Sequence, residues 1–280
     1  MRDSALVDVD WLFTHINDEN LVVLDASVQP VVLGFESCNS KGNFSAIAGA
    51  RRFDYDQQVC KPSSPLPHMM PSASLFQEKV RALGINNQDT LIVYDDVGLY
   101  ASPRAWWMFK AMGHGDVFVL DGGLPAWLAE AYPVTDSLAE AADSGNFDAT
   151  EQEGLFCDFE VVLAAIDDDQ RQIFDARSAG RFDGTAPEPR PGVRGGHIPS
   201  AYNLPFPEVL KEGRLRQPEE LRRLFIEKAT QDQQVITSCG SGITACVLTL
   251  AAWEIGYRNL AVYDGSWAEW GSPSHLPVIK

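Results

Sequence analysis

The chain repeats itself, and this duplication limits its fold more than any other feature. Residues 90–127 and 234–270 share one pattern, in which an apolar strand, a loop, a helix and a second apolar strand precede a short segment ending in Trp. Asp121 matches Asp264 in this pattern, and the two lie 143 residues apart. Solenoid repeats are about 20–50 residues long. The longer period therefore indicates a duplicated domain.

Each copy alternates short apolar strands with helical segments. In the second copy we expect strands at 173–175, 201–203, 234–238 and 260–263, and helices near 218–228 and 245–255. Continuous apolar strands separated by helices are typical of a parallel sheet with both faces covered. The sequence therefore predicts an α/β fold of two tandem domains, each a mainly parallel sheet covered by helices on both faces.

The domain boundaries are predicted from composition. A segment rich in Ala, Glu, Asp and Gly with little periodicity occupies residues 138–155, and such a segment is typical of a linker. We therefore place the first domain at residues 1–137 and the second at residues 156–280.

The charge balance argues against one broad class of function. The 280 residues include 22 Lys and Arg against 39 Asp and Glu, which gives a net charge of −17. A chain this acidic repels phosphate backbones, so we expect no general binding of nucleic acid. We find no run of about 18 apolar residues, so we expect no membrane span. The acidic N-terminal segment does not resemble a secretory signal.

The five cysteines contain no C-x-x-C pair. They are Cys38, Cys60, Cys157, Cys239 and Cys246. This spacing argues against a zinc ribbon, a thioredoxin-type dithiol and a disulfide scaffold, so we expect no metal site. Reduced thiols indicate a cytoplasmic protein.

Cys239 stands where a strand passes through a tight loop into a helix. The loop, residues 240–244, reads Gly-Ser-Gly-Ile-Thr. Such a loop gathers backbone N–H groups into an anion-binding cradle, which favours the thiolate over the thiol and makes the sulfur nucleophilic. The alternative is a buried structural cysteine, a common role for unpaired thiols. The two glycines in the loop favour the nucleophile.

Residues 239–245 resemble the active-site loop of the rhodanese superfamily and, within it, of the 3-mercaptopyruvate sulfurtransferases. The similarity covers nearly the whole chain. It includes residues 175–177, 180–182, 188–192, 196–199 and 263–270 in the second copy, and residues 102–108 and 122–127 in the first. One domain of this family has lost its cysteine. Asp96 lies 143 residues before Cys239, so we expect Asp96 in the place of the sulfur and an inactive first domain.

The resemblance implies sulfur transfer through a cysteine persulfide. Cys239 would take sulfur from 3-mercaptopyruvate, a small anionic donor, and release pyruvate. The acceptor would be a thiol, such as reduced thioredoxin, or cyanide. A single activated cysteine suits such a two-step transfer, and no metal or organic cofactor is required.

The resemblance also assigns the other candidate site residues. Arg181 and Arg190 would hold the substrate carboxylate, which the forked guanidinium can bind bidentately; surface ion pairs are the alternative. Ser241 would assist proton movement to the leaving enolate, or would serve only the turn. The loop completes the binding site with Gly240, Gly242, Ile243 and Thr244.

Two further residues are expected to be structural. Arg177 follows Asp175 closely, and an ion pair between them is the expected role. His197 could be a general base, but a lone histidine without a positioned partner is better explained as structural. The first copy has Ala46 in place of this histidine, so a proton relay through it is not expected.

Two other functions stay open. A thiosulfate sulfurtransferase, which uses cyanide as acceptor, is the first. Those enzymes carry basic residues in the cysteine loop, whereas residues 240–244 carry none. A non-catalytic sulfur carrier or docking module is the second, and the retained cysteine and arginines argue against it. A cysteine phosphatase needs an arginine six residues after the cysteine, where this chain has Ala245.

Overall fold

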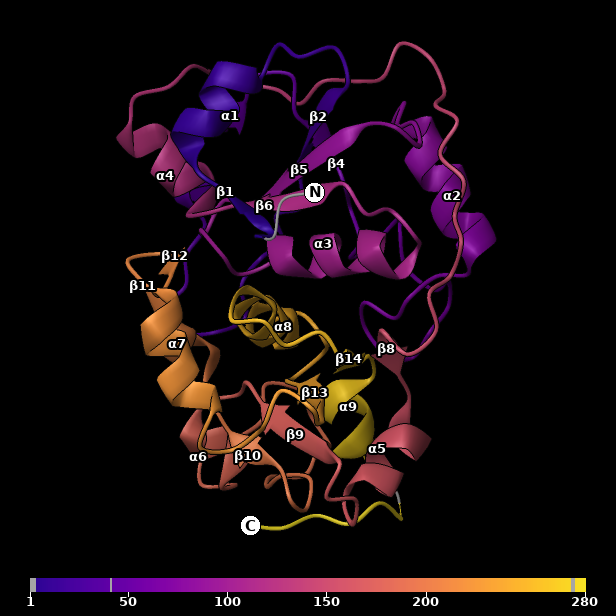
Figure 1. The fold of residues 1–280 in the computed structure, drawn as a ribbon, viewed down its shortest axis with the longest axis vertical. Coiled ribbons are helices and arrows are strands. Elements are labelled where there is room, and N and C mark those ends of the chain that lie inside the picture. The colour runs from indigo at the N-terminus through magenta and orange to yellow at the C-terminus, as the bar shows by residue number, and fades with distance from the viewer. Residues whose placement is uncertain (1–3, 41, 273–274) are drawn as a thin grey trace. The chain divides into compact units, whose positions relative to one another are not determined.

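A computed structural model describes residues 4–40, 42–272 and 275–280 of the chain (Figure 1). The chain forms two compact units. Unit 1 comprises Met1–Pro62, Met70–Gln152 and Glu212–Leu215, and unit 2 comprises Ser63–Met69, Glu153–Lys211 and Arg216–Lys280. Each unit contains one five-stranded sheet with helices packed around it, so the expected α/β fold with two similar domains is confirmed. The linker at residues 138–155 stays a prediction.

The sheet of unit 1 is parallel throughout, with the strand order β1-β6-β5-β2-β4. Its strands are β1 (Leu6–Val7), β2 (Leu21–Asp25), β4 (Arg51–Arg52), β5 (Thr90–Tyr94) and β6 (Val117–Leu120). Its helices are α1 (Val9–His15), α2 (Ala73–Ala82), α3 (Ser102–Ala111) and α4 (Gly123–Ala129), with a short 3-10 turn, η1 (Cys38–Ser40). A small antiparallel pair joins β3 (Ala46–Ile47) to β7 (Val134–Thr135). Helix α3 packs on β5 and β6.

Unit 2 repeats this plan with the strand order β10-β9-β13-β14-β8, again all parallel. Its strands are β8 (Phe156–Cys157), β9 (Arg171–Asp175), β10 (Tyr202–Asn203), β13 (Gln234–Ser238) and β14 (Leu260–Tyr263). Its helices are α5 (Phe159–Ala165), α6 (Ala179–Phe182), α7 (Pro218–Phe225), α8 (Ala245–Glu254) and α9 (Ser266–Trp270), with a 3-10 turn, η2 (Phe206–Val209). Of the two remaining short strands, β11 (Leu210–Lys211) belongs to unit 2 and β12 (Arg214–Leu215) to unit 1. Helix α8 packs on β13 and β14, as α3 does in unit 1.

The expected elements of unit 2 are all present, with small shifts at their ends. Strand β9 begins at Arg171, earlier than expected, because Arg171 and Gln172 still pair with β13 although they are polar. Helix α7 begins at Pro218, where Gln217 and Glu220 form a capping box, and it ends at Phe225. Both central strands, β5 and β13, are buried over their last four residues, as parallel strands covered on both faces should be. Among the described residues, no helix is long and apolar enough to span a bilayer.

The strand registers correct one expectation about the repeat. Asp25 pairs with Tyr94 in unit 1, and Asp175 pairs with Ser238 in unit 2. The residues that follow these strands, Asp95 and Cys239, therefore correspond to each other, and the prediction that Asp96 takes the place of Cys239 is wrong.

The α9 region and its counterpart agree with this register. The N–H of Leu124 donates to the Asp95 carbonyl at 2.9 Å, and the N–H of Trp267 donates to the Cys239 carbonyl at the same distance.

The prediction for Asp96 is wrong because the loop of unit 1 has one extra residue. Seven residues separate β5 from α3, whereas six separate β13 from α8. A constant spacing cannot reveal an insertion inside a loop.

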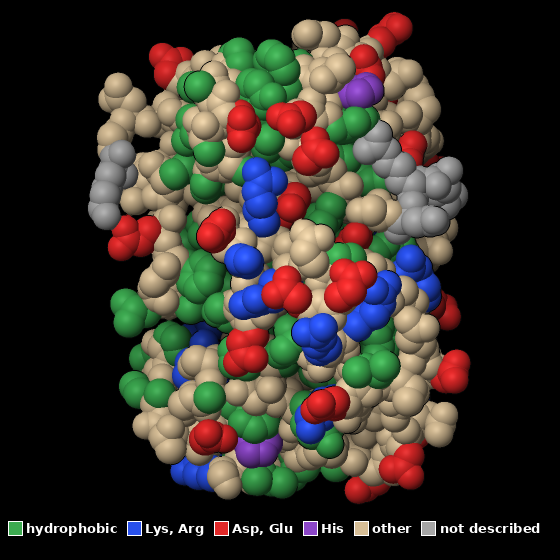
Figure 2. All heavy atoms as spheres, turned by 60° about the vertical axis from the view of Figure 1, so that its left-hand side comes forward, with side chains coloured by type: hydrophobic (Ala, Val, Ile, Leu, Met, Phe, Trp, Pro, Cys, Tyr) green, Lys and Arg blue, Asp and Glu red, His purple; other side chains and the backbone are tan. Residues whose placement is uncertain are grey.

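Charged side chains of both signs lie on the face drawn in Figure 2. There, Asp and Glu side chains lie between Lys and Arg side chains without an extended basic area.

Candidate active site

Cys239 follows the last residue of β13, and helix α9 fixes its backbone. The Cys239 N–H donates to the Ser266 hydroxyl at 3.1 Å. Its carbonyl accepts the Trp267 N–H at 2.9 Å, and the next carbonyl, of Gly240, accepts the Ala268 N–H at 2.9 Å. The Cys239 residue is only 1% exposed. The nucleophile candidate is therefore rigidly placed at the carboxyl end of the sheet, where parallel α/β folds carry their ligand sites.

The loop after Cys239 turns back over the sulfur. The Gly242 N–H donates to Cys239 Sγ at 3.1 Å. Gly242 has φ +80°, a left-handed conformation that a residue with a Cβ adopts only with strain. The glycine is therefore needed for the turn that aims this N–H at the sulfur.

Five other N–H groups of the loop and the start of α8 are unbonded. The amides of Gly240, Ser241, Ile243, Thr244 and Ala245 donate to no acceptor within residues 4–40, 42–272 and 275–280. They lie in the same loop as the Gly242 amide, which bonds the buried sulfur, so they are available to an anionic group that enters the loop.

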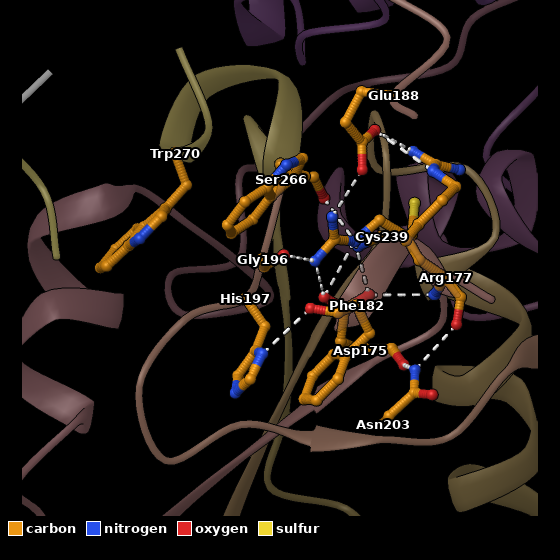
Figure 3. A network of polar contacts seen from close by, with 12 residues as sticks. Asp175, Arg177, Phe182, Glu188, Gly196, His197, Asn203, Cys239, Ser266 and Trp270 are labelled. Carbon is orange, nitrogen blue, oxygen red and sulfur yellow. Dashed lines mark hydrogen bonds and ion pairs between the residues drawn. The ribbon is translucent and has the colours of Figure 1, made fainter. Parts of the chain in front are cut away.

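A network of buried charges lies beside this loop. The Arg177 side chain is fully buried, and it forms an ion pair with Asp175 at 2.6 Å and another with Glu188 at 2.9 Å. Its guanidinium also donates to the Gly196 carbonyl at 2.9 Å and lies 4.0 Å from the ring centroid of Trp267. Figure 3 shows Asp175, Arg177 and Glu188 joined in this network next to Cys239. The expected ion pair of Arg177 with Asp175 is thus present.

Glu188 connects this buried network to Arg181. One Glu188 oxygen binds Arg177, and the other accepts from Arg181 Nη2 at 2.6 Å and from Nε at 3.2 Å. A Cβ placed on Gly240 would lie 3.0 Å from Arg181 Nη2, so the guanidinium lies against the backbone of the loop. The structure therefore brings Arg181, Gly240 and Cys239 together.

The other predicted site residues differ in how firmly they are held. Arg190 is half-buried and forms no hydrogen bond or ion pair with any described residue. Ser241 is 7% exposed, and its hydroxyl likewise has no partner in the described part of the chain. Ile243 and Thr244 are buried in the loop.

His197 is held as a structural residue would be. Its Nδ1 lies 3.0 Å from the Phe182 carbonyl oxygen, and its ring stacks on Phe182 with 3.8 Å between centroids. Its backbone pairs with Ile279. These contacts use the ring and the backbone for packing, in line with the expected structural role.

The family model for a rhodanese-like domain matches the chain twice, over residues 8–130 and 158–273. The chain belongs to the rhodanese family. A 3-mercaptopyruvate sulfurtransferase of Escherichia coli (strain K12) is 38% identical over 281 residues, which is 99% of each chain. The human 3-mercaptopyruvate sulfurtransferase is 38% identical over 274 residues, which is 95% of this chain and 91% of that one. This rhodanese-family chain is therefore an enzyme of the sulfurtransferase class.

Two further comparisons concern the other donor and the fold. A mouse thiosulfate sulfurtransferase is 39% identical over 276 residues, covering 95% of this chain and 91% of that one. The crystal structure of SseA from Escherichia coli, described as a 3-mercaptopyruvate sulfurtransferase with a rhodanese fold, superposes with a TM-score of 0.83 at 35% identity. It covers 94% of this chain, and 99% of that chain is covered in turn. The two donors named for these relatives are thus not separated by overall identity.

Unit 1 of this rhodanese-family chain carries a carboxylate, Asp95, where unit 2 carries its thiol, and a second carboxylate, Asp96, directly after it. Asp96 lies beside a cavity of about 250 Å³ that Asp25, Ser27 and Arg52 also line. Its carboxylate accepts a hydrogen bond from the Ser37 hydroxyl. Burial raises the pKa of Asp96, and the hydrogen bond from Ser37 opposes that rise.

The nearest thiol in unit 1, Cys38, is not set up as a nucleophile. Its N–H donates to the Asp96 carbonyl at 2.9 Å. Burial, and then the charge of Asp96, raises the pKa of Cys38 to about 11. A thiol with such a pKa is almost entirely protonated near neutral pH, so it is a poor nucleophile.

Sequence reasoning missed Glu188, Ser266 and the full role of Trp267. Glu188 stands between two candidate arginines, seven residues after one and two before the other, and that alternation of charge was the available signal. Ser266 and Trp267 follow a strand with no charge or motif to single them out. Their contacts with Cys239 and Arg177 depend on tertiary packing.

Proposed function

We propose that the protein takes sulfur from 3-mercaptopyruvate, carries it as a persulfide on Cys239 and passes it to a thiol or to cyanide. The observation that carries this proposal is the loop of residues 240–245. It supplies a backbone N–H that donates to Cys239 Sγ and contains no cation. The names of the relatives support the class of reaction.

Two displacements complete the reaction. The Cys239 thiolate attacks the mercapto sulfur, a sulfur–sulfur bond forms, and the carbon–sulfur bond breaks with its electron pair leaving on the enolate of pyruvate. The enolate then takes up a proton at carbon and becomes pyruvate. We assign this proton transfer to Ser241, whose hydroxyl has no partner among the described residues. The acceptor thiolate then attacks the outer sulfur, and Cys239 leaves as the thiolate.

Arg181 and Arg190 hold the carboxylate of the donor. Glu188 occupies Nε and Nη2 of Arg181, and Nη1 has no partner in the described part of the chain. Arg190 has its whole guanidinium available, since it is bonded to none of the described residues. Both can therefore donate to an anionic group without first breaking an existing hydrogen bond.

The neutral loop favours 3-mercaptopyruvate over thiosulfate. Thiosulfate is a dianion that must approach an anionic sulfur, and two unit charges about 4 Å apart repel by roughly 4 kcal/mol at an effective dielectric constant of 20. Residues 240–244 supply only amides and two hydroxyls against that repulsion. 3-Mercaptopyruvate carries one charge, and its carboxylate is separated from the reacting sulfur. Thiosulfate sulfurtransferase activity is the second candidate, supported by the mouse relative.

Several sulfur acceptors fit this proposal. A small thiol, reduced thioredoxin or cyanide would each supply a nucleophile for the outer sulfur. The spacing of the five cysteines argues against a disulfide scaffold, which is typical of a chain from a reducing compartment. We therefore place the protein in the cytoplasm.

Mass spectrometry and paired kinetics test this function. After exposure to 3-mercaptopyruvate without an acceptor, the unmodified protein should gain one sulfur atom and release one pyruvate, and Cys239→Ser should do neither. Cys60→Ser, which changes a half-buried thiol of unit 1, is the matched control and should behave as the unmodified protein does. Sulfur on another cysteine, or a higher kcat/KM with thiosulfate, would overturn the proposal.

A further inference from the structure

The two copies of the cysteine loop use their backbone N–H groups in opposite ways. In unit 1 the Asp95 carboxylate accepts six hydrogen bonds from its own loop. Oδ1 accepts from the amides of Val97 at 3.0 Å and Gly98 at 2.9 Å. Oδ2 accepts from the amides of Tyr100 at 3.1 Å and Ala101 at 2.9 Å. It also accepts from the amide and the hydroxyl of Ser102, at 2.8 Å and 2.7 Å.

Asp95 stands in the place of Cys239, as the strand registers show. In both units the third residue after this position donates its N–H to the side chain. Gly98 donates to Asp95 Oδ1 at 2.9 Å, and Gly242 donates to Cys239 Sγ at 3.1 Å. The Asp95 carboxylate and the Cys239 sulfur thus accept from equivalent N–H groups.

The Oδ2 oxygen of Asp95 has no counterpart in unit 2. The three amides that it binds are the last two of the loop and the first of α3. The equivalent amides before and at the start of α8 are those of Ile243, Thr244 and Ala245, and they bind no described acceptor. A persulfide adds one anionic atom beyond Sγ, two bonds from Cβ, which is also where the oxygens of a carboxylate side chain at this position lie.

We propose that Asp95 is an internal anion ligand, which fills in unit 1 the place that the outer sulfur of the Cys239 persulfide takes in unit 2. Unit 1 lacks the thiol, and it also cannot bind an anion in its loop, because the Asp95 carboxylate already accepts the hydrogen bonds of the loop N–H groups. The cradle itself accepts a small monoanion of carboxylate size. The part that concerns unit 2 rests on the proposed function, and the part that concerns Asp95 does not.

Chemical rescue tests the Asp95 part without any sulfur chemistry. Asp95→Ala removes the carboxylate and should lower Tm by several degrees, since six donors lose their acceptor. Sodium formate should restore part of that Tm relative to sodium chloride at the same concentration, because formate supplies a carboxylate of the lost size. Asp96→Ala is the matched control. Its carboxylate accepts from the Ser37 side chain rather than from the loop amides, so formate and chloride should act on it alike. Equal effects of the two salts on Asp95→Ala would overturn the proposal.

A second variant covers the case in which Asp95→Ala does not fold. Asp95→Asn keeps the shape but replaces one acceptor oxygen with a donating amide that faces N–H groups. Its Tm should fall below that of the unmodified protein. A Tm equal to or above that of the unmodified protein would overturn the assignment of Asp95 as the ligand of the loop.

Residue-resolved amide exchange of the unmodified chain tests the part that concerns unit 2. The amides of Ile243, Thr244 and Ala245 should exchange fast in the resting protein and more slowly once mass spectrometry shows the added sulfur. The amides that bind Asp95 should be slow in both states. If sulfur is present and the three amides do not change, this inference is wrong while the proposed function stands. If no sulfur is gained, the proposed function fails, and the rescue experiment still decides the role of Asp95.

Discussion

At the scale of single residues, Glu188 holds Arg181 and, among the described residues, makes no recorded contact with Arg190. It bonds Arg177 with one oxygen and Arg181 with the other, so a buried charge network sets the position of the arginine that we propose binds the substrate. Arg181 and Arg190 could be singled out as candidates from the sequence, because a motif carries them. The role of Glu188 could not, since an acidic residue between arginines can equally pair with solvent-exposed partners.

Replacing Glu188 with Gln should weaken substrate binding more than it weakens the chemical step. Gln keeps one acceptor oxygen but loses the charge-assisted hydrogen bonds to Arg181, each worth roughly 1.5–3 kcal/mol. We expect kcat/KM for 3-mercaptopyruvate to fall by about tenfold or more, mainly through KM. Steady-state kinetics measure this. Glu219→Gln, which changes an exposed partner of Arg222 on α7, should leave both constants unchanged. An unaltered KM in Glu188→Gln would contradict the positioning role.

The raised pKa of Asp96 predicts how one carboxyl affects stability. Burial raises the pKa of the folded carboxyl above its ordinary value of 3.8, so the folded state holds the proton more tightly than the unfolded state does. The stability that this group contributes is present below the ordinary value and is lost as pH rises through the interval up to the raised value. Asp96→Asn should therefore raise Tm near neutral pH. It should also reduce the decrease in Tm as pH rises from the ordinary pKa of the carboxyl to its raised pKa.

Thermal unfolding over a series of pH values checks this expectation for Asp96. Asn can still accept the hydrogen bond from Ser37, so the local geometry is preserved. Asp143→Asn, at an exposed position of unit 1, should give the pH profile of the unmodified protein. A lower Tm for Asp96→Asn near neutral pH would show that the charged form is the stabilising one.

At the scale of elements, the loop between strand and helix distinguishes the two units. The strand, loop and helix around Cys239 could be predicted from glycine spacing and apolar runs, and the structure contains them. The correspondence of Asp95 with Cys239 could not, because the extra residue of unit 1 lies inside a loop, where neither hydrophobic periodicity nor a constant offset marks it. Strand pairing was needed to locate it.

The turn at Gly242 should be required for activity beyond its effect on stability. Gly242→Ala puts a Cβ at φ +80° and should cost about 1 kcal/mol or more in stability. It should also redirect the N–H that bonds Cys239 Sγ, so kcat/KM should fall at least tenfold. Gly49→Ala is the matched control, because Gly49 has φ +78° and open space around it in unit 1.

Unfolding curves and kinetics of the two glycine variants separate these effects. Similar losses of stability with activity lost only in Gly242→Ala would support the role of the turn. If both variants keep full activity, the N–H of Gly242 is not needed at the sulfur.

At the scale of the whole molecule, duplication and charge could both be read from the sequence, and they differ in what they explain. The repeat predicted two similar sheets, because continuous apolar strands pair in parallel wherever helices can cover them. The net charge of −17 predicts long-range repulsion within the folded chain. The bounds of the two units were harder to predict, because two short segments cross over. Unit 2 includes Ser63–Met69, although the residues on both sides belong to unit 1, and unit 1 includes Glu212–Leu215, although the residues on both sides belong to unit 2.

Salt should therefore stabilise this chain. Raising NaCl from about 10 mM to about 150 mM shortens the Debye length from roughly 30 Å to roughly 8 Å and screens repulsion between distant carboxylates. We expect Tm to rise by a few degrees over that range, with most of the rise at the lower concentrations. Differential scanning calorimetry at fixed pH measures it. A Tm that falls with salt would show that the local ion pairs outweigh the net repulsion.

The contact between Gly240 and Arg181 limits how donor preference can change. Any side chain at position 240 begins with a Cβ that would lie 3.0 Å from Arg181 Nη2, and Glu188 holds that guanidinium in place. A basic residue introduced at position 240 to attract a dianion would therefore displace Arg181, the arginine that we propose receives the carboxylate. We expect substitutions at position 240 to change how Arg181 is placed as well, so that a gain in activity with one donor would come with a loss of activity with the other.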